Sequence, residues 1–452
     1  MIAPLSEGAL PLKGWRHTFS SLSGNRDFSF LFAGNVSFFF GMQMMMILSG
    51  WLVIDRWDNA AFLGYVMASA AIPMLVLAPV GGVVSDRVDK RKLLLVTQCL
   101  LVLTSSLVSF LILTGSIQFW HLLVITPVSA VAFSFNIPGR QALVAMLVPR
   151  DRLMNAISLS TAAMNASRIV APALAGILIA PIGIGGAYVV ATAWYAGSAV
   201  ATGFLPTSRP RRLREFTFLQ DFTGGFQYIR SSSLLMGLLL FATVPMIFAM
   251  PYQTLLPVFA DDVWHVGSAG LGVMQAASGV GGLIGAIVVA NLDGYRRKGT
   301  LMLGAALVFG ALVFLFAMSP WFGLTMVVMA MIGFMSMTFT TVNNTVIQMV
   351  IPDEVRGRVM SVMMMTFGLM PLGAVPAGIA AQSVGAPPVV AAGAVLFIIS
   401  TLGIFVADPS LRTLDRSMEE GRERETARRS APALALSDTI PVAATFTHEE
   451  AV

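Results

Sequence analysis

The chain has 452 residues, of which 56% are hydrophobic and only 11% are charged. Roughly a quarter of the residues of a soluble domain are charged, so this composition excludes a water-soluble globular protein. The formal net charge is +5 at pH 7, from 28 Lys and Arg against 23 Asp and Glu. A chain of this kind requires lipid as its main solvent.

Apolar stretches long enough to cross a bilayer recur along the sequence. A hydrocarbon core of ~30 Å needs about 20 apolar residues per helix. The run from Leu100 to Leu113 shows no alternation of apolar and polar residues, which argues against a transmembrane β-barrel. We therefore expect an all-α membrane protein with twelve transmembrane helices, at about 28–54, 61–83, 93–114, 119–142, 154–180, 184–205, 234–257, 268–291, 300–318, 321–346, 357–383 and 387–407.

Residues 1–24 precede the first stretch and form the expected cytoplasmic N-terminal segment. They contain no short apolar run before a small-residue cleavage site, so we expect no removable signal peptide. The single cysteine, Cys99, lies in the third stretch, which excludes an internal disulfide and disfavours a cysteine metal site. We expect neither a metal nor a cofactor.

The basic residues are distributed unequally between the loops. Sixteen Lys and Arg lie in or at the edges of the loops on one side, and only Arg56 lies in the loops on the other. The positive-inside rule then places both termini in the cytoplasm. The positive charge reflects membrane topology, so no nucleic-acid partner is expected.

Two pairs of segments indicate an internal duplication. Residues 140–151 align with residues 343–354, and each segment closes an apolar stretch and enters a charged loop. Residues 63–67 resemble 271–274, and each opens a stretch that ends in a basic loop. Repeats of this kind are typical of transporters that rock about a central site.

The repeats divide the chain into two six-helix halves, 25–206 and 234–408. Between them, residues 207–233 form a polar cytoplasmic linker, whose part from Phe218 onward suits an interfacial helix with aromatic residues against lipid. Residues 409–452 are charged and then rich in Ala, Ser and Thr, which predicts a disordered cytoplasmic tail.

The loop after the second stretch carries a family resemblance. Residues Gly82 to Lys92 read GVVSDRVDKRK, which resembles the signature Gly-x-x-x-Asp-Arg-x-Gly-Arg-Arg-Lys of the major facilitator superfamily. Asp89 stands where the family has its second glycine. The resemblance implies two six-helix halves around a central cavity that opens alternately to the two sides of the membrane.

Three further segments resemble the bacterial enterobactin-exporter and drug-efflux branch of that superfamily. They are Asn25–Phe28, Arg168–Gly176 and Ile351–Ser361. The second is similar to an antiporter signature, Gly-Pro-x-x-Gly-Gly, with alanines in place of two glycines. This resemblance implies a multi-pass protein of the bacterial inner membrane.

Two arginines inside the predicted spans are candidate functional residues. Arg140 is near the cytoplasmic end of the fourth stretch, and Arg168 is in the middle of the fifth. A charge in lipid is costly, so each is a candidate substrate-binding residue that would attract an anionic group. Alternatively, Arg168 bonds carbonyls or Asn165 and holds helix packing, and Arg140 extends to the cytoplasmic surface.

No Asp, Glu or His lies well inside a predicted span. Many relatives carry an acid after the glycine of the first helix, but here Gly41 is followed by Met42 and Gln43. This departure weakens the case for proton antiport, although protons remain a candidate coupling ion. Asp27, Asp55 and Asp86 lie near helix ends and are the candidate carriers.

The signature loop suits a conformational latch. Asp86, Arg87 and Arg91 would close the cytoplasmic ends of the second and eleventh helices while the protein faces outward. The carboxylate would gain from the dipole of the eleventh helix and from Arg356 or Arg358. A purely topological role for these charges is the alternative.

Uncharged polar residues complete the predicted cavity. They fall on helices that face the central cavity in this superfamily, although such residues also form hydrogen bonds between helices. They are Asn35, Gln43, Asn136, Tyr252, Gln253, Asn343 and Asn344.

No catalytic constellation and no phosphate-binding loop is recognisable, so the sequence argues against an enzyme. We expect a monomeric secondary transporter of small molecules that exports a bulky amphipathic compound, such as a drug or a siderophore-like metabolite. The 28 methionines suit a pliable surface for such substrates. Uptake or exchange of a metabolite or lipid, uncoupled from protons, is the alternative.

Overall fold

A computed structural model describes residues 25–207, 218–292, 295, 297–352, 355, 359–360, 362–363 and 365–416. Helices and short turns make up this part of the chain, and it contains no strand. The first half comprises α1 (Arg26–Trp57), α2 (Ala60–Arg87), α3 (Lys90–Leu113), α4 (Phe119–Leu147) and α5 (Arg150–Gly203). The second comprises α6 (Phe218–Ser231), α7 (Ser233–Val244), η1 (Pro245–Ala249), α8 (Pro251–Val258), η2 (Phe259–Val263), α9 (Gly267–Asn291), α10 (Lys298–Met318), α11 (Phe322–Val350), η3 (Thr366–Leu369), α13 (Met370–Val384), α14 (Ala386–Ala407) and α15 (Pro409–Arg412).

The described residues include ten helical segments that are long and apolar enough to cross a membrane. One of them, α5, covers two of the predicted stretches. These are two helices joined directly at Gly183, where the backbone turns with φ 70° and ψ 168°. This φ favours glycine, which has no Cβ to clash there. The predicted stretch 357–383 corresponds to η3 and α13 and is not among the ten, so the count of twelve remains a prediction.

Short polar side chains set the beginnings of the first three helices. Asn25 accepts a hydrogen bond from the Phe28 backbone, and Asn59 accepts one from the Ala61 backbone. The carboxylate of Asp89 accepts hydrogen bonds from the backbone N–H groups of the first turn of α3. Asp89 therefore serves as the N-cap of α3 at the position where the family signature has glycine.

The segment from Ser233 to Val263 is a single membrane span with two irregular turns. Its helix widens into π-helical turns at η1 and η2, and η1 begins at Pro245. A proline lacks the N–H that would continue the regular ladder, so its presence at this point accounts for the first widening. The short helix α8, which lies between these turns, contacts α1 and α2 of the first half as well as α13 and α14 of the second.

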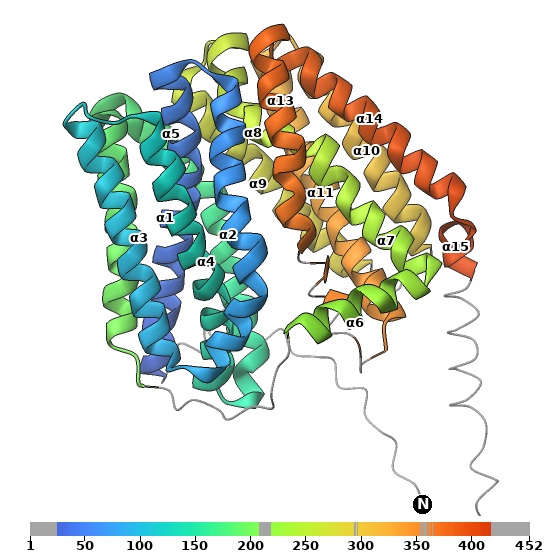
Figure 1. The fold of residues 1–452 in the computed structure, drawn as a ribbon, viewed down its shortest axis with the longest axis horizontal. Helices are drawn as coiled ribbons and strands as arrows, with labels where there is room; N and C mark the ends of the chain where they lie inside the picture. The colour runs from blue at the N-terminus through green and yellow to red at the C-terminus, as the bar shows by residue number, and fades with distance from the viewer. Residues whose placement is uncertain are drawn as a thin grey trace, which may run out of the picture.

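The two halves stand side by side, lean together at the top of Figure 1 and separate toward the bottom, where α6 lies across the bundle. Residues far apart in the sequence meet where the halves lean together. Ala60 N donates to Gln382 Oε1 at 2.8 Å, and Ser268 Oγ donates to the Gly176 carbonyl at 3.1 Å. These contacts lie at the ends of the helices opposite the basic loops, called here the distal end.

Glycines allow these crossings. A Cβ on Gly64 would lie 2.8 Å from the carbonyl oxygen of Ala374, and one on Gly378 would lie 2.7 Å from that of Ala60. On the other side of the interface, a Cβ on Gly176 would overlap the Ser268 carbonyl. Backbones that approach this closely gain dispersion contacts along their length, which is how small residues hold membrane helices together.

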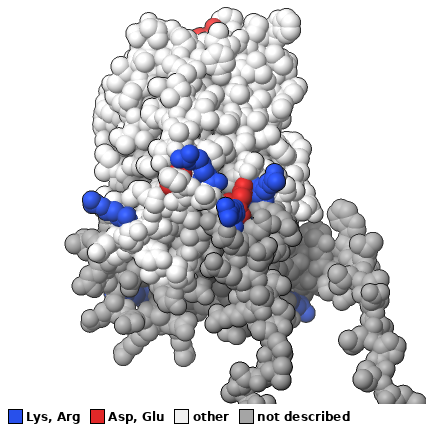
Figure 2. Space-filling view, turned by 90° about the vertical axis from the view of Figure 1, so that its right-hand side faces the viewer, with Lys and Arg blue, Asp and Glu red and all other residues white. Residues whose placement is uncertain are grey.

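The outer surface is apolar. Figure 2 shows a wide white face above a band of Lys, Arg and Asp side chains on the side of the second half. Side chains such as Trp321, Met318 and Val406 are more than half exposed on this half. Such a surface matches hydrocarbon, and the charged band matches a membrane boundary.

Residues 409–416, which the sequence assigns to the tail, instead pack against the helices. Asp408 accepts a hydrogen bond from Ser233, and Asp415 accepts bonds from the backbones of Gly299 and Thr300 at the start of α10. Leu411 is buried. Residues 417–452 of the predicted tail lie outside the described residues.

We expect Gly281→Ala to lower the free energy of unfolding by at least about 1–3 kcal/mol, because the new Cβ would overlap the carbonyl of Ala330 in α11. Gly304→Ala is the matched control: Gly304 is exposed on α10 with nothing within 4 Å of a new Cβ. It should leave stability unchanged or raise it by up to about 1 kcal/mol. Thermal unfolding of the purified protein in detergent measures both, and equal melting temperatures would contradict the packing described here.

Candidate functional site

A cavity of about 270 Å³ lies between the two halves. It is called the head lobe, and helices of both halves line it: α1 and α5 from the first half, α8 and α9 from the second. Its lining residues are Phe39, Met42, Gln43, Met46, Ile47, Met164, Arg168, Pro172, Gln253, Gln275, Ser278 and Gly279. A central cavity shared by two repeats is where transporters bind substrate.

Helix periodicity explains how these side chains converge. The five lining residues of α1 follow the spacing i, i+3, i+4, i+7 and i+8 from Phe39 to Ile47, which is one face of a helix. Met164, Arg168 and Pro172 are four residues apart on α5 and share a face as well. The head lobe is therefore built from continuous helix faces.

Arg168 is the one charged residue that lines the head lobe. Its side chain is exposed within the described structure, and no described residue forms a hydrogen bond or an ion pair with it. The polar atoms that line the lobe with it belong to Gln43, Gln253, Gln275 and Ser278. The lobe thus holds one uncompensated positive charge beside neutral hydrogen-bonding groups.

Two further cavities adjoin the head lobe. The hydroxyl lobe, of about 240 Å³, lies within the first half and includes Thr104, Ser105, Tyr188 and Tyr195 in its lining. The apolar lobe, of about 230 Å³, lies among α1, α2, α4, α8 and α9, and most of its lining surface is hydrocarbon. Met46 lines all three lobes and is 46% exposed.

Arg140 lies in a different environment from Arg168. Its guanidinium is 4% exposed and donates to three neutral acceptors: Asn136 Oδ1 at 2.7 Å, Asn35 Oδ1 at 2.7 Å and Ser198 Oγ at 2.6 Å. Its charged carbon also lies 4.1 Å from the centre of the Phe38 ring, a cation–π contact. The side chain extends neither to the membrane surface nor into any of the three lobes.

The network around Arg140 continues to a fourth element. Asn136 Nδ2 donates to Thr97 at 2.8 Å, and Gln98 Nε2 donates to Ser198 at 3.1 Å. Ser198 Oγ in turn donates to the Gly34 carbonyl at 2.8 Å. These bonds join α1, α3, α4 and the second part of α5, all in the first half.

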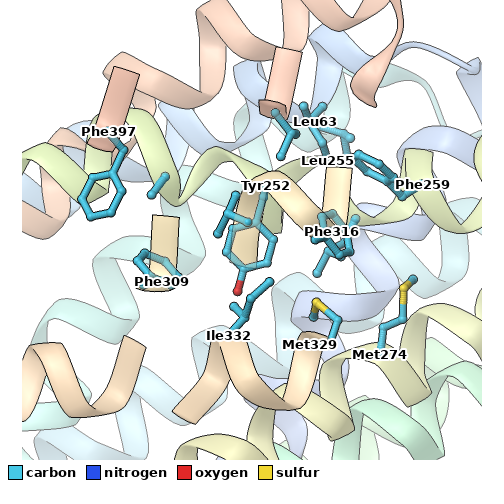
Figure 3. Packing of buried hydrophobic residues seen from close by; sticks show 14 of the residues in the cluster. Leu63, Tyr252, Leu255, Phe259, Met274, Phe309, Phe316, Met329, Ile332 and Phe397 are labelled. Carbon is cyan, nitrogen blue, oxygen red and sulfur yellow. The ribbon is translucent and has the colours of Figure 1, made fainter. Parts of the chain in front are cut away.

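The other predicted binding residues divide between the cavity and the core. Gln43 and Gln253 line the head lobe. Tyr252 is buried, and Figure 3 shows its ring among Phe309, Phe316 and Ile332, with its hydroxyl directed toward Ile332. Gln253 Nε2 donates to that hydroxyl at 3.3 Å, so Tyr252 positions a lining residue.

Asn343 and Asn344 of α11 line none of the three lobes. Asn343 is 2% exposed, and its Oδ1 has no hydrogen-bond partner among the described residues. Asn35 and Asn136 likewise line no lobe, and both accept hydrogen bonds from Arg140. The structure therefore brings together only part of the predicted set.

Of the predicted latch residues, two are described with their side chains. Arg87 is exposed at the end of α2, and Arg91 donates a hydrogen bond to the Gly203 carbonyl at the end of α5. The side chain of Asp86, and Arg356 and Arg358 entirely, lie outside the described residues.

Several lining residues were missed from the sequence. Gln275 and Ser278 are polar, three residues apart and therefore on one face of α9. Their spacing in an otherwise apolar helix was a usable indication. The sequence predicts a methionine surface for substrate but does not single out Met42, Met46 and Met164 within it, because methionine is common at lipid-facing and core positions alike.

The positions of the two arginines predict a large loss of stability on replacement of Arg140 and almost none on replacement of Arg168. Arg140→Gln should lower the free energy of unfolding by about 2 kcal/mol or more, because the buried Asn35 and Asn136 oxygens lose their guanidinium donor and Ser198 loses one of its two donors. Arg168→Gln should change it by less than about 0.5 kcal/mol, because Arg168 has no partner to lose. Thermal unfolding of the two variants measures the difference, and a similar loss in both would contradict the geometry.

Comparison with known proteins agrees with this architecture. The nucleoside transporter NupG superposes with a TM-score of 0.69 at 14% identity, over 84% of this chain and 98% of that one. A bacterial homologue of the human lysosomal transporter Spinster, in an inward-facing and unoccupied conformation, superposes with a TM-score of 0.65 at 12% identity, over 86% and 98%. At these identities the likeness shows the fold alone.

Two relatives in sequence are named as exporters. Macrolide efflux protein A of Streptococcus pyogenes is 22% identical over 325 residues, covering 71% of this chain and 80% of the relative. The enterobactin exporter EntS of Shigella flexneri is 27% identical over 296 residues, covering 63% and 68%. The model of the transmembrane secretion effector family matches residues 17–432. The predicted resemblance is confirmed: the chain belongs to this family of major facilitator transporters and is not an enzyme.

Proposed function

We propose that this transporter exports a bulky amphipathic compound from the cytoplasm across the bacterial inner membrane, as a monomer with both termini in the cytoplasm. The observation that carries the proposal is the group of three lobes between and beside the halves, lined by methionine, aromatic and amide side chains with a single charge. The relatives support it, since one is named for macrolide efflux and another for enterobactin export.

Alternating access is the mechanism that the interface supports. The halves meet at the distal end through the pairs α2–α13 and α5–α9, where glycines permit close backbone contact. We infer that this arrangement is the inward-facing state. Its conversion to the outward-facing state separates these two crossings while the network around Arg140 keeps the first half rigid.

We further propose that the loop after α2 is a latch that forms in the outward-facing state. In the present state Arg91 bonds the end of α5 and Arg87 is exposed, so neither is engaged across the halves in the described part of the chain. Rocking of the halves would bring Asp86, Arg87 and Arg91 toward the start of the eleventh predicted helix. Arg356 or Arg358 would then pair with Asp86.

The energy source is an ion or substrate gradient. No Asp, Glu or His lines any of the three lobes, so a proton, if coupled, is carried at a helix end by Asp27, Asp55 or Asp86.

Flux measurements in liposomes test this function. A fluorescent amphipathic dye should cross in a saturable manner and follow an imposed pH gradient, and Asp86→Asn should slow it several-fold by removing the latch carboxylate. Asp58→Asn is the matched control, because Asp58 ends α1 at the distal end with a φ of 45°, which asparagine tolerates.

Saturable flux that ignores the pH gradient would exclude proton antiport and favour exchange. Non-saturable flux in the reconstituted wild type would contradict transport of this class of compound. Equal rates for Asp86→Asn and Asp58→Asn would contradict the latch.

A further inference from the structure

The charge of Arg168 has no counter-ion in the cavity. None of the residues that line the head, hydroxyl or apolar lobes is acidic, and the described residues offer Arg168 neither a hydrogen bond nor an ion pair. An unpaired guanidinium within a membrane protein is costly unless it is hydrated or meets an anion. Arg140, the other arginine within a predicted span, is by contrast saturated by neutral acceptors.

The surroundings of Arg168 suit an anionic group. A guanidinium presents a planar fork of N–H donors that matches two oxygens of a carboxylate, sulfonate or phosphate. The amide groups of Gln43, Gln253 and Gln275 and the hydroxyl of Ser278 line the same lobe and can donate to the remaining oxygens. The same positive charge disfavours a cationic compound at this position.

The apolar lobe can hold the hydrophobic part of the ligand. It shares Met46, Ile47, Gln253 and Gln275 with the head lobe, so one molecule can extend from one into the other. Leu63, Val66 and Leu271 are among its lining residues. Met46 stands between the lobes, and its flexible thioether side chain can adjust to bodies of different shape.

We propose that the ligand of this cavity is an amphipathic anion, with its acidic group on Arg168 in the head lobe and its hydrophobic body in the apolar lobe. The consequence of this binding for transport rests on the proposed function, but the binding of an anion at Arg168 does not depend on it. The proposal assigns Arg168 as the residue that selects the charge of the substrate and Met46 as the contact shared by both parts of the ligand.

A matched pair of probes tests the proposal in phosphatidylcholine nanodiscs. Dansylglycine carries a carboxylate, and dansylglycinamide is the same molecule with a neutral amide in its place. The fluorescence of both increases in an apolar site. The wild-type protein should bind dansylglycine about tenfold or more tightly than dansylglycinamide, because a charge-assisted hydrogen bond is lost with the carboxylate.

The variants assign that preference to particular lobes. Arg168→Gln should weaken dansylglycine binding about tenfold and leave dansylglycinamide within about twofold, which also shows that the variant is folded. Arg168→Lys should keep part of the preference. Ala70→Phe, which fills the apolar lobe, should weaken both probes alike. Arg56→Gln, an exposed arginine outside all three lobes, should change neither.

Equal binding of the two probes to the wild type, no saturable binding of either, or an equal loss of both in Arg168→Gln would overturn the proposal. Addition of phosphatidylglycerol to the discs separates the possible sources of the anion: loss of dansylglycine binding would assign Arg168 to a lipid headgroup and overturn a soluble ligand. A retained anion preference without dye flux in liposomes would contradict the transport proposal while leaving the site intact.

Discussion

The hydrogen bonds of Arg140 hold the first half of this protein together. A membrane interior offers no water to satisfy a guanidinium, so its donors must find acceptors on neighbouring helices. Asn35, Asn136 and Ser198 supply them from α1, α4 and α5, and Gln98 adds α3. Because all of these bonds lie within one half, that half can move as a unit.

Rigid halves become useful only if the interface between them can open. Most of its described close contacts are between backbones at glycines such as Gly64, Gly176 and Gly378, and few side-chain bonds cross it. Contacts of this type depend on short-range dispersion. The free-energy cost of separating them is small, because new contacts with lipid or at the opposite end of the interface replace them. Strong polar bonding inside a half and weak bonding between halves together produce a rocking motion about the central cavity.

The sequence predicts the spans and the family well because hydrophobic length and the loop signature are local properties. Gln43, Gln253 and Arg168, which the sequence proposes as binding residues, line the head lobe. The sequence did not distinguish these cavity-lining residues from Asn35 and Asn136, which are bonded within the first half. A polar residue in a span indicates only that it has some hydrogen-bonding partner. Whether that partner is protein or ligand depends on the rotation of each helix, which long-range packing fixes.

The two arginines show what decides whether a polar residue in a span binds protein or ligand. Both lie on helices of the first half, and both would be expected to seek an anion. Arg140 faces Asn35 and Ser198 on adjacent helices, which satisfy its donors without any charge, whereas Arg168 faces α8 and α9 of the other half across a cavity. A group that faces the other half across the cavity can contact a substrate and also respond when the halves move. Its lack of a protein partner is therefore a property of the site, because a permanent counter-ion would cancel the charge that a transported anion needs.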